Sequence, residues 1–585
     1  MVRGGSFAPS VGKSLRMRYV ALACDYDGTI AADGVVSDEV VDALRRLRES
    51  GRKTFLVTGR ELGDLEHVFE HLDVFDLVVA ENGAVHLDPA NRDVRTLAER
   101  PPDRFVETLR ERGVEPLSVG NVIVATWEPH QGTVLETIHD LGLELQVIFN
   151  KGAVMVLPAG VNKASGLAEA LTSVGLSPHN VVGVGDAEND HAFLDLCELS
   201  VAVDNALPTI KEHCDHVTRG ARGDGVVELI EAMLENDLEE LDEQVRRHDI
   251  PIGTREDGEP VPIRPYRTNV LVTGPSGSGK STLVTALLEQ LVERSYQFCL
   301  VDPEGDYEEL EHAVVLGSPD RAPTPDEALR VLDDPSANLA LNLLGIRLDD
   351  RPAFLEALLP RLQELRARTG RPHFMIVDEA HHLLPSGLQT TDTTMPRDVA
   401  SIVFVTVHAD AMSPEALEPI DLVLTPPKNP TESLRVFAET VGIAPPDTAQ
   451  LHPQEQEAVA WFLGELPFAF EKVEPNKERR RHRRKYAEGD VQEKAFYFRG
   501  PEQRLNLKVQ NLALFAQVAE GLDDETWGWH LERGDYERWF REAVKDDELA
   551  DIARDAADAA DPQGSRERIM HAIAERYTLP AEAAT

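Results

Sequence analysis

Short apolar segments alternate with amphipathic helical segments over the first 245 residues. The apolar segments include YVALACDYDGT, KTFLVTGR and FDLVVAENGAV, and the helical segments include VVDALRRLRES and ELGDLEHVFEHL. Apolar strands that alternate with helices are typical of a parallel sheet covered on both faces. The rhythm changes between about 86 and 156 and then resumes with NVVGVGDAEND. We therefore expect an α/β core over 18–245, with an α/β cap inserted at about 86–156.

A second series of apolar strands leads into loops or helices from residue 250 onward. It comprises NVLVTG, QFCLVDPEG, HFMIVDEAHH and SIVFVTVHA, and a segment rich in Pro, Gly and charge, HDIPIGTREDGEPVPIRPYR, precedes it as a linker or an edge hairpin. This pattern predicts a second parallel-sheet domain over 250–430. Residues 431–585 are more mixed and predict a linker and a small, mainly helical module, and residues 1–17 predict a disordered tail.

Length and charge limit the classes of function. A chain of 585 residues suggests three or four domains. It carries 59 Lys and Arg against 103 Asp and Glu, a net charge of -44 that opposes a general nucleic-acid surface. The basic run at 476–485 is the exception, and we expect it to meet an acidic face of the protein rather than nucleic acid. Four scattered cysteines and no apolar run of ~18 residues predict a cytoplasmic protein without a membrane segment.

Acidic, hydroxyl and basic side chains follow the strands of the first domain, where parallel sheets place their active sites. Asp25 and Asp27 in DYDGT suit a nucleophile and a general acid for phosphoryl transfer. Thr58 in VTGR offers a hydroxyl to a phosphoryl oxygen, and Lys163 in VNKASGL offers a positive charge. The further carboxylates in GDAEND complete an acidic cluster that favours Mg²⁺.

These four motifs, in this order, resemble the haloacid dehalogenase superfamily, specifically its Cof-type (subfamily IIB) phosphatases, over roughly 17–240. The resemblance implies that Asp25 is the nucleophile and that Asp27 is the general acid and base. The short cap is similar to those of archaeal-type phosphoglycolate phosphatases and sucrose-phosphate phosphatases, which implies a small phosphorylated acid or sugar as substrate. The implied phosphate-binding residues are Thr58, Gly59, Lys163 and Asn189, and the implied Mg²⁺ ligands are Asp25, Asp27, Asp186 and Asp190.

The second domain carries a phosphate-binding loop, GPSGSGKS, between a strand and a helix. Lys280 suits the β and γ phosphates of ATP, and the Ser281 hydroxyl suits the Mg²⁺ shell. About 100 residues later, HFMIVDEAHH places Asp378 to hold Mg²⁺ and Glu379 to activate water, which favours an ATPase over a kinase. The predicted ATP-binding residues are Gly274, Pro275, Ser276, Gly277, Ser278, Gly279, Lys280, Ser281 and Thr282.

This domain resembles the HerA-FtsK class of P-loop ATPases over about 250–430. The resemblance implies that Asp302, Glu304 and Asp306 lie near the nucleotide and that VTVHAD is the sensor strand, with His408 where the family commonly has glutamine. Ring-forming members of the class pump DNA, which implies a homo-oligomer through this domain.

We therefore expect an α/β hydrolase that cleaves a phosphomonoester at Asp25 and ATP at 274–281, with Mg²⁺ at both sites. One alternative is a nucleic-acid end-processing or translocating enzyme, which the overall charge disfavours. A second alternative is a nucleotide-switched regulatory protein, which the intact motifs disfavour. In the C-terminal module, the aromatic residues at 527–539 are expected to form a core.

Overall fold

The computed structural model describes residues 17–576 except 151, 243, 309, 388–400, 476–494, 502–503, 510, 545 and 558–560. The basic run at 476–485 and the expected N-terminal tail up to residue 16 lie outside the described residues. The chain divides into two compact units, Met1–Val473 and Glu474–Thr585. Within the described part of the chain, we find no helix with the length and apolar character that a membrane span requires.

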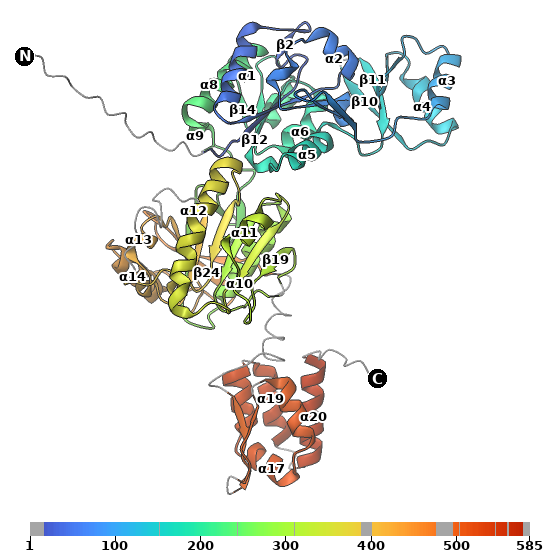
Figure 1. Cartoon of the computed structure of the whole chain (residues 1–585). Coiled ribbons are helices and arrows are strands. Elements are labelled where there is room, and N and C mark those ends of the chain that lie inside the picture. The colour runs from blue at the N-terminus through green and yellow to red at the C-terminus, as the bar shows by residue number, and fades with distance from the viewer. Residues whose placement is uncertain are drawn as a thin grey trace, which may run out of the picture. The chain divides into compact units, whose positions relative to one another are not determined.

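The first domain is built on an eight-stranded sheet in the order β14-β13-β12-β1-β4-β5-β6-β7. Six strands are parallel, and β6 and β7 are antiparallel. Helices α1 and α8 pack together, as do α5 and α6, and the two pairs cover opposite faces (Figure 1). The parallel strands are β1 (Ala21–Cys24), β4 (Lys53–Val57), β5 (Leu77–Ala80), β12 (Val181–Gly185), β13 (Leu199–Ala202) and β14 (His216–Val217). The helices are α1 (Asp38–Glu49), α2 (Leu62–Val68), α5 (Lys163–Ser173), α6 (His191–Leu196), α7 (Pro208–His213) and α8 (Gly223–Asn236).

A separate four-stranded antiparallel sheet, β10-β11-β9-β8, forms the cap together with α3 (Asp103–Glu111) and α4 (Gln131–Asp140). Its strands are β8 (Ser118–Val119), β9 (Val124–Trp127), β10 (Leu145–Asn150) and β11 (Ala153–Pro158). The cap has its own small core, which includes Phe105, Leu109 and Val154. The inserted segment also contains β6 (Val85–Asp88) and β7 (Asp93–Thr96), which extend the core sheet and not the cap sheet.

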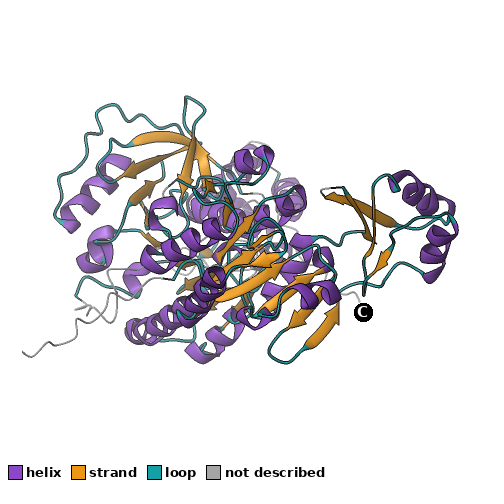
Figure 2. Ribbon diagram, turned by 90° about the horizontal axis from the view of Figure 1, so that it is seen from above, coloured by secondary structure: helices purple, strands orange, loops and turns teal. Residues whose placement is uncertain are grey.

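The second domain contains an eleven-stranded sheet in the order β16-β15-β25-β24-β23-β17-β22-β21-β18-β20-β19. Its parallel strands are β17 (Val270–Thr273), β18 (Phe298–Asp302), β19 (Ala313–Leu316), β20 (Asn338–Asn342), β21 (Phe374–Val377), β22 (Ile402–Thr406) and β23 (Leu422–Thr425). Helices α10 (Lys280–Glu293), α11 (Pro325–Leu332), α12 (Arg351–Thr369) and α14 (Pro430–Val441) accompany them, and Figure 2 shows helices beside the sheets. The α/β class with two mainly parallel sheets is confirmed.

Two hairpins flank the parallel part of the second sheet. The Pro- and Gly-rich segment before the P-loop forms β15 (Ile250–Thr254) and β16 (Pro260–Ile263), which is the edge-hairpin alternative. Strands β24 (Glu457–Phe462) and β25 (Phe468–Lys472) pair with β23 and β15. The sheet therefore continues past residue 430, where the sequence pattern suggested that the domain ends.

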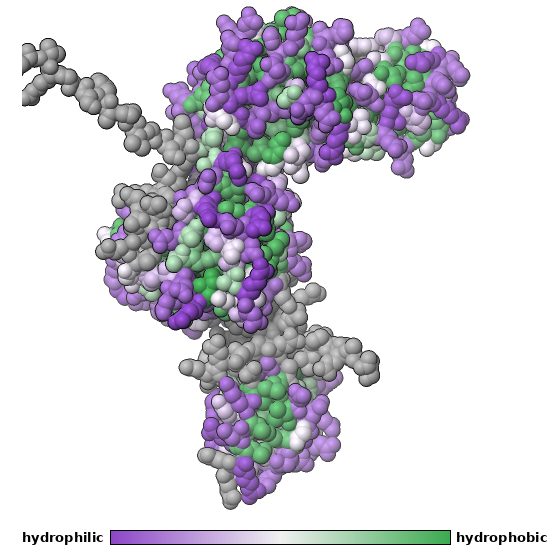
Figure 3. Space-filling view, in the orientation of Figure 1, coloured by the Kyte–Doolittle hydropathy of each residue, from purple (hydrophilic) through white to green (hydrophobic). Residues whose placement is uncertain are grey.

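The C-terminal unit combines a short hairpin with a set of helices. The hairpin is β26 (Phe496–Phe498) and β27 (Leu507–Val509), and the helices include α16 (Leu512–Glu520), α17 (Asp524–Glu532), α18 (Asp535–Trp539), α19 (Asp547–Ala557) and α20 (Pro562–Arg576). Trp527, Tyr536 and Trp539 are buried in its core, as expected, whereas Trp529 is only half-buried. The indole of Trp527 donates to Ser565 Oγ at 3.0 Å. In the first unit, hydrophilic side chains cover most of the visible face (Figure 3), in keeping with the net charge of -44.

Candidate functional sites

The first candidate site lies at the carboxyl ends of β1 and β12, where Lys163 bridges two buried carboxylates. Its Nζ donates to Asp25 Oδ1 at 2.5 Å and to Asp190 Oδ1 at 2.6 Å. Lys163 is the first residue of α5, which Asn162 caps by accepting from the N–H of Ser165. All three charged side chains are almost fully buried, so the ammonium group offsets charge that water cannot screen.

Asp186 brings a third carboxylate to the same place. Ligand oxygens of Asp25, Asp186 and Asp190 all lie within 4.8 Å of one another. Asp190 Oδ2 accepts from the N–H groups of Asp186 and Ala187, at 2.9 Å each, which fixes the loop after β12. Gly28 permits the close approach, because a Cβ atom there would lie 2.3 Å from Asp186 Oδ2 and the residue has φ +90°.

Burial dominates the electrostatics of this cluster. Burial, and then the neighbouring charge of Asp190, raise the pKa of Asp25 above its ordinary value, while Lys163 opposes the rise. For Lys163, burial lowers the pKa, but Asp190 and Asp25 outweigh it and the net shift is upward. Three carboxylates for one ammonium leave an excess of negative charge. Hard oxygen ligands and net negative charge are the properties that Mg²⁺ prefers, so the cluster fits a divalent cation.

Asp27 and Thr58 lie beside this cluster, and Arg60 makes hydrogen bonds with both of them. The guanidinium group of Arg60 donates to both carboxylate oxygens of Asp27 at 2.7 Å, and its main-chain N–H donates to Thr58 Oγ1 at 3.1 Å. The Asp27 side chain is 43% exposed, whereas Thr58 is buried. Arg60 was not among the predicted site residues, although it directly follows Thr58 and Gly59 in VTGR.

Gly59 and Asn189 lie together at the same site. A Cβ atom on Gly59 would lie 3.5 Å from Asn189 Nδ2 and 3.7 Å from the sulfur of Met155, which belongs to the cap. Asn189 Nδ2 donates to Asn82 Oδ1 at 3.4 Å, and its own Oδ1 is buried with no hydrogen bond among the described residues. The structure therefore brings every predicted residue of the first site to one end of the sheet.

The second candidate site is the loop between β17 and α10. Gly277 and Gly279 adopt φ +70° and +104°, conformations that favour glycine. Lys280, the first residue of α10, donates from Nζ to the carbonyl of Gly274 at 2.9 Å and to that of Pro275 at 3.3 Å. The loop thus surrounds an ammonium group at a helix N-terminus, an arrangement suited to phosphate. The remaining predicted loop residues, Ser276, Ser278, Ser281 and Thr282, lie in the same strand-to-helix segment.

Two acids follow strand β21, which lies beside β22 and β18 in the sheet. Asp378 is buried and accepts from the N–H of Glu379 at 2.9 Å. Glu379 has φ +38°, a strained conformation for a residue with a side chain. Burial, then the charges of Asp378 and Glu304, raise the pKa of Glu379 to about 7. A carboxyl group with this pKa is suited to accept a proton from water at neutral pH.

Four further residues lie at or near the ends of these neighbouring strands. Burial raises the pKa of Asp302 to about 7, with Asp378 adding to the rise, so the expected proximity of this acid to the site is consistent with the structure. His381 Nδ1 lies 3.1 Å from Thr406 Oγ1 at the end of β22, and His408 is exposed. The link from His381 to Thr406 was not predicted. It ties the segment after β21 to the expected sensor strand.

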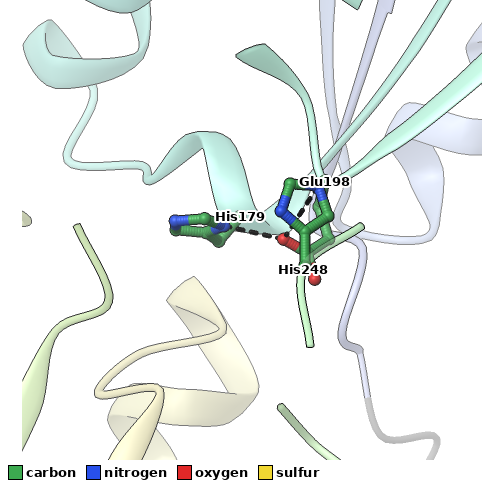
Figure 4. A group of neighbouring side chains, drawn as sticks. All are labelled: His179, Glu198 and His248. Atoms are coloured by element: carbon green, nitrogen blue, oxygen red, sulfur yellow. Dashed lines mark hydrogen bonds and ion pairs between the residues drawn. The ribbon is translucent and has the colours of Figure 1, made fainter. Parts of the chain in front are cut away.

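A third cluster is formed by His179, Glu198 and His248 (Figure 4), none of which belongs to either candidate site. Glu198 already accepts from His179 Nδ1 at 2.7 Å, from Arg18 at 2.5 Å and from the Tyr296 hydroxyl at 3.1 Å. Burial would raise the pKa of Glu198, but the hydrogen bond from His179 and the charges of His248 and Arg18 hold it below its ordinary value. The adjacent guanidinium group disfavours a divalent cation, so we interpret the cluster as a structural ion pair.

This cluster belongs to a buried contact between the two sheets. Asn180 immediately precedes β12, and its side chain contacts the Tyr266 hydroxyl at 2.7 Å and His373 Nε2 at 3.2 Å. His373 immediately precedes β21. The sheets therefore meet at the amino ends of their strands, whereas both candidate sites follow the carboxyl ends. Strand β21 has four residues and strand β12 has five, at about 3.3 Å per residue, and each strand lies between this contact and the site of its own domain. The two sites therefore do not share a cavity.

The geometry of the first site defines a phosphoryl-handling hydrolase, with a carboxylate nucleophile candidate, a lysine and an acidic cation site on a parallel sheet. Comparison with known protein families agrees, since residues 22–131 and 121–230 match the haloacid dehalogenase-like hydrolases. The chain belongs to the haloacid dehalogenase-like hydrolase family through this domain. Residues 261–405 match the AAA ATPase domain. The chain is therefore a hydrolase that joins a phosphatase-type domain to an ATPase domain.

Curated relatives of the first domain include archaeal phosphoglycolate phosphatases. That of Methanothermobacter thermautotrophicus is 33% identical over 220 residues, which cover 36% of this chain and 96% of the relative. That of Haloarcula marismortui is 30% identical over 218 residues, which cover 36% of this chain and 95% of the relative. Among solved structures, a haloacid dehalogenase-like hydrolase from Bacteroides thetaiotaomicron covers 37% of this chain and 99% of its own, at 18% identity and a TM-score of 0.32.

Proposed function

We propose that the first domain hydrolyses a phosphomonoester through a phosphoryl group carried on Asp25. The observation that carries this proposal is the pair of bonds from Lys163 to Asp25 and Asp190 inside an acidic, buried cluster. Asp25 Oδ1 attacks phosphorus and the bond to the leaving oxygen breaks. Lys163 and Thr58 neutralise and hold the phosphoryl oxygens, with Gly59 and Asn189 beside them.

In this proposal Asp27 acts first as the general acid and then as the general base. It protonates the leaving oxygen in the first half of the reaction and takes a proton from water in the second half, when water displaces Asp25 from phosphorus. The bidentate contact with Arg60 fixes the orientation of the Asp27 carboxylate, and one of its two hydrogen bonds must be released when Asp27 takes up a proton.

Asp25, Asp186 and Asp190 would hold Mg²⁺ through their carboxylates, and Asp27, whose carboxylate contacts Arg60, would hold it through its main-chain carbonyl. When bound, Mg²⁺ lowers the repulsion between the anionic substrate and the carboxylate nucleophile. The Cβ of residue 28 would intrude on Asp186, so glycine at this position keeps space around the cation ligands.

We propose a small phosphorylated acid or sugar as substrate, with phosphoglycolate as the first candidate. The coverage of almost the whole length of two phosphoglycolate phosphatases supports it. The short cap of four strands and two helices supports an assignment to the Cof-type, subfamily IIB branch. We also propose the domain division 18–245, 250–473 and 474–585, in which β24 and β25 extend the second domain beyond residue 430.

A panel of phosphoglycolate, sugar phosphates and nucleotides, each assayed for phosphate release with and without Mg²⁺, tests the proposal. We expect release from at least one small phosphomonoester, dependent on Mg²⁺ and abolished in Asp25→Asn. Acid quenching during turnover with a ³²P-labelled substrate should leave a hydroxylamine-sensitive label on the wild-type protein. Turnover without such a label, or turnover that survives in Asp25→Asn, would exclude the aspartyl-phosphate route.

For the second domain we propose Mg²⁺-dependent ATP hydrolysis. Residues 274–282 would bind the phosphates, Ser281 and Asp378 would hold Mg²⁺, and Glu379 would orient and deprotonate water. The raised pKa of Glu379 and its position next to Asp378 support that role. The HerA-FtsK class and assembly of several copies through this domain are also part of the proposal.

We further propose that the ATPase domain does not supply substrate to the phosphatase site, because the two sheets contact each other at the ends opposite to the sites. Translocation of nucleic acid stays the alternative, and DNA-stimulated ATP turnover would favour it. A cytoplasmic location is supported by the four free cysteines, three of which are buried.

A further inference from the structure

Glu81 connects the phosphatase core to its cap. It lies between β5 and β6, and its side chain is fully buried. Glu81 and Asn82 have φ +52° and +56°, so two successive residues with side chains adopt the left-handed conformation. Such strain persists where surrounding contacts over-determine the backbone, and it concentrates at functional sites.

The Glu81 carboxylate accepts four hydrogen bonds from one turn of the cap. Oε1 accepts from the N–H and the side-chain amide of Asn121, at 2.9 and 3.0 Å. Oε2 accepts from the N–H groups of Val122 and Ile123, at 2.7 and 2.9 Å. This turn joins β8 to β9, and a Cβ atom on Gly120 would lie 2.8 Å from Oε1. Charge-assisted bonds of this kind fix both the position and the orientation of the turn.

The main chain at the same point is tied to the phosphate-binding strand end. The N–H of Glu81 donates to the carbonyl of Arg60 at 2.9 Å, and the N–H of Asn82 donates to the carbonyl of Thr58 at 3.0 Å. The Asn82 side chain reaches Asn189, whose Oδ1 is buried without a hydrogen bond among the described residues. One short segment therefore contacts the phosphate-binding residues, the loop after β12 and the cap.

We infer that Glu81 is a positioning residue that fixes the cap sheet over the site and thereby sets which leaving groups the phosphatase accepts. By fixing the cap, Glu81 sets the distance between Met155 of the cap and Gly59, Asn82 and Asn189 of the core. The unpaired Oδ1 of Asn189 suits a hydroxyl group on the leaving group, which within the proposed substrate class favours a sugar phosphate over phosphoglycolate, because phosphoglycolate has no free hydroxyl. This inference rests on the proposed phosphatase function.

Glu81→Gln tests the inference, because the amide keeps the shape but presents an NH₂ group to a turn of N–H donors. Glu107→Gln, on the exposed face of α3, is the matched control. The assay compares kcat and KM for the best substrate of the panel with those for p-nitrophenyl phosphate. Hydrogen exchange of the Val122 and Ile123 amides supplies a readout that is independent of activity.

We expect Glu81→Gln to exchange these two amides at least tenfold faster and to lower kcat/KM for the best substrate at least tenfold, mainly through KM. For p-nitrophenyl phosphate the change should stay below threefold, and Glu107→Gln should match the wild type throughout. Equal losses for both substrates, or faster exchange with unchanged discrimination, would overturn the inference. A wild-type protein that hydrolyses no panel member would instead overturn the proposed function.

Discussion

His373 Nε2 lies 3.2 Å from Asn180 Oδ1, and this contact joins the strand that leads to Asp378 to the strand that leads to Asp186. His373 Nδ1 accepts from the N–H of Gln297 at 2.8 Å, so the proton must reside on Nε2, which donates to Asn180. The two hydrolytic domains are thus connected through a neutral, fully buried imidazole at the opposite end of each sheet from its site.

Replacing Asn180 by leucine should destabilise the first unit. The substitution leaves the His373 Nε2–H, the Tyr266 hydroxyl and the carbonyl of Arg18 without their Asn180 partner. Buried polar groups that lose a partner cost about 1–3 kcal/mol each, so we expect a loss of at least about 2 kcal/mol in urea unfolding. Asn91→Leu, at an exposed position after β6, should change stability by less than about 0.5 kcal/mol. Similar effects for both variants would show that the contact contributes little.

Acid should weaken this contact. Burial, with the nearby charges of His179 and Arg371, holds the pKa of His373 well below its ordinary value, so the unfolded chain binds its proton first. The contribution of His373 is fully present above the unfolded pKa of about 6.5 and is lost as pH falls below it, by up to about 1.4 kcal/mol per pH unit. Between pH 7.5 and 5, thermal unfolding should therefore show a steeper loss of stability for the wild type than for His373→Gln. Parallel pH profiles would contradict this assignment.

Gly28→Ala should impair the phosphatase alone. The added Cβ would meet Asp186 Oδ2 at 2.3 Å and the residue has φ +90°, so both the turn after β1 and the cation ligands must shift. We expect at least a tenfold loss of Mg²⁺-dependent phosphate release with ATP hydrolysis retained. Gly132→Ala, on α4 with nothing within 4 Å of the new Cβ, is the control and should leave both activities unchanged. Full phosphatase activity in Gly28→Ala would show that Asp186 does not require its observed position.

Lys163→Met should strongly reduce the rate of phosphate release. It should also make the stability of the folded protein more dependent on Mg²⁺. Removal of one preorganised charge typically costs a factor of about 10²–10³ in rate. The variant also leaves Asp25, Asp186 and Asp190 without the ammonium group that bridges two of them. Added Mg²⁺ should therefore raise the melting temperature of Lys163→Met more than that of the wild type. An equal or smaller Mg²⁺ effect would mean that the carboxylates do not form the cation site.

Much of both sites could be predicted because the residues occur in short motifs directly after apolar strands. Asp25, Asp186 and Asp378 fall at such positions, Lys163 opens the helix α5, and the topology brings the motifs of each domain to one edge. Glu81 and the contact between Asn180 and His373 could not be predicted, because they depend on partners about 40 and 193 residues away. Strands β24 and β25 were missed because they follow a polar, Pro-rich stretch and pair antiparallel to the rest of the sheet.

The central claim is that one chain carries two independent phosphoryl-transfer sites. It is tested most directly by measuring phosphate release from the best panel substrate and ATP hydrolysis in Asp25→Asn and Lys280→Ala. We expect Asp25→Asn to lose the first activity and to keep the second, and Lys280→Ala to do the reverse. Loss of both activities in either folded variant, or retention of phosphate release in Asp25→Asn, would contradict the account.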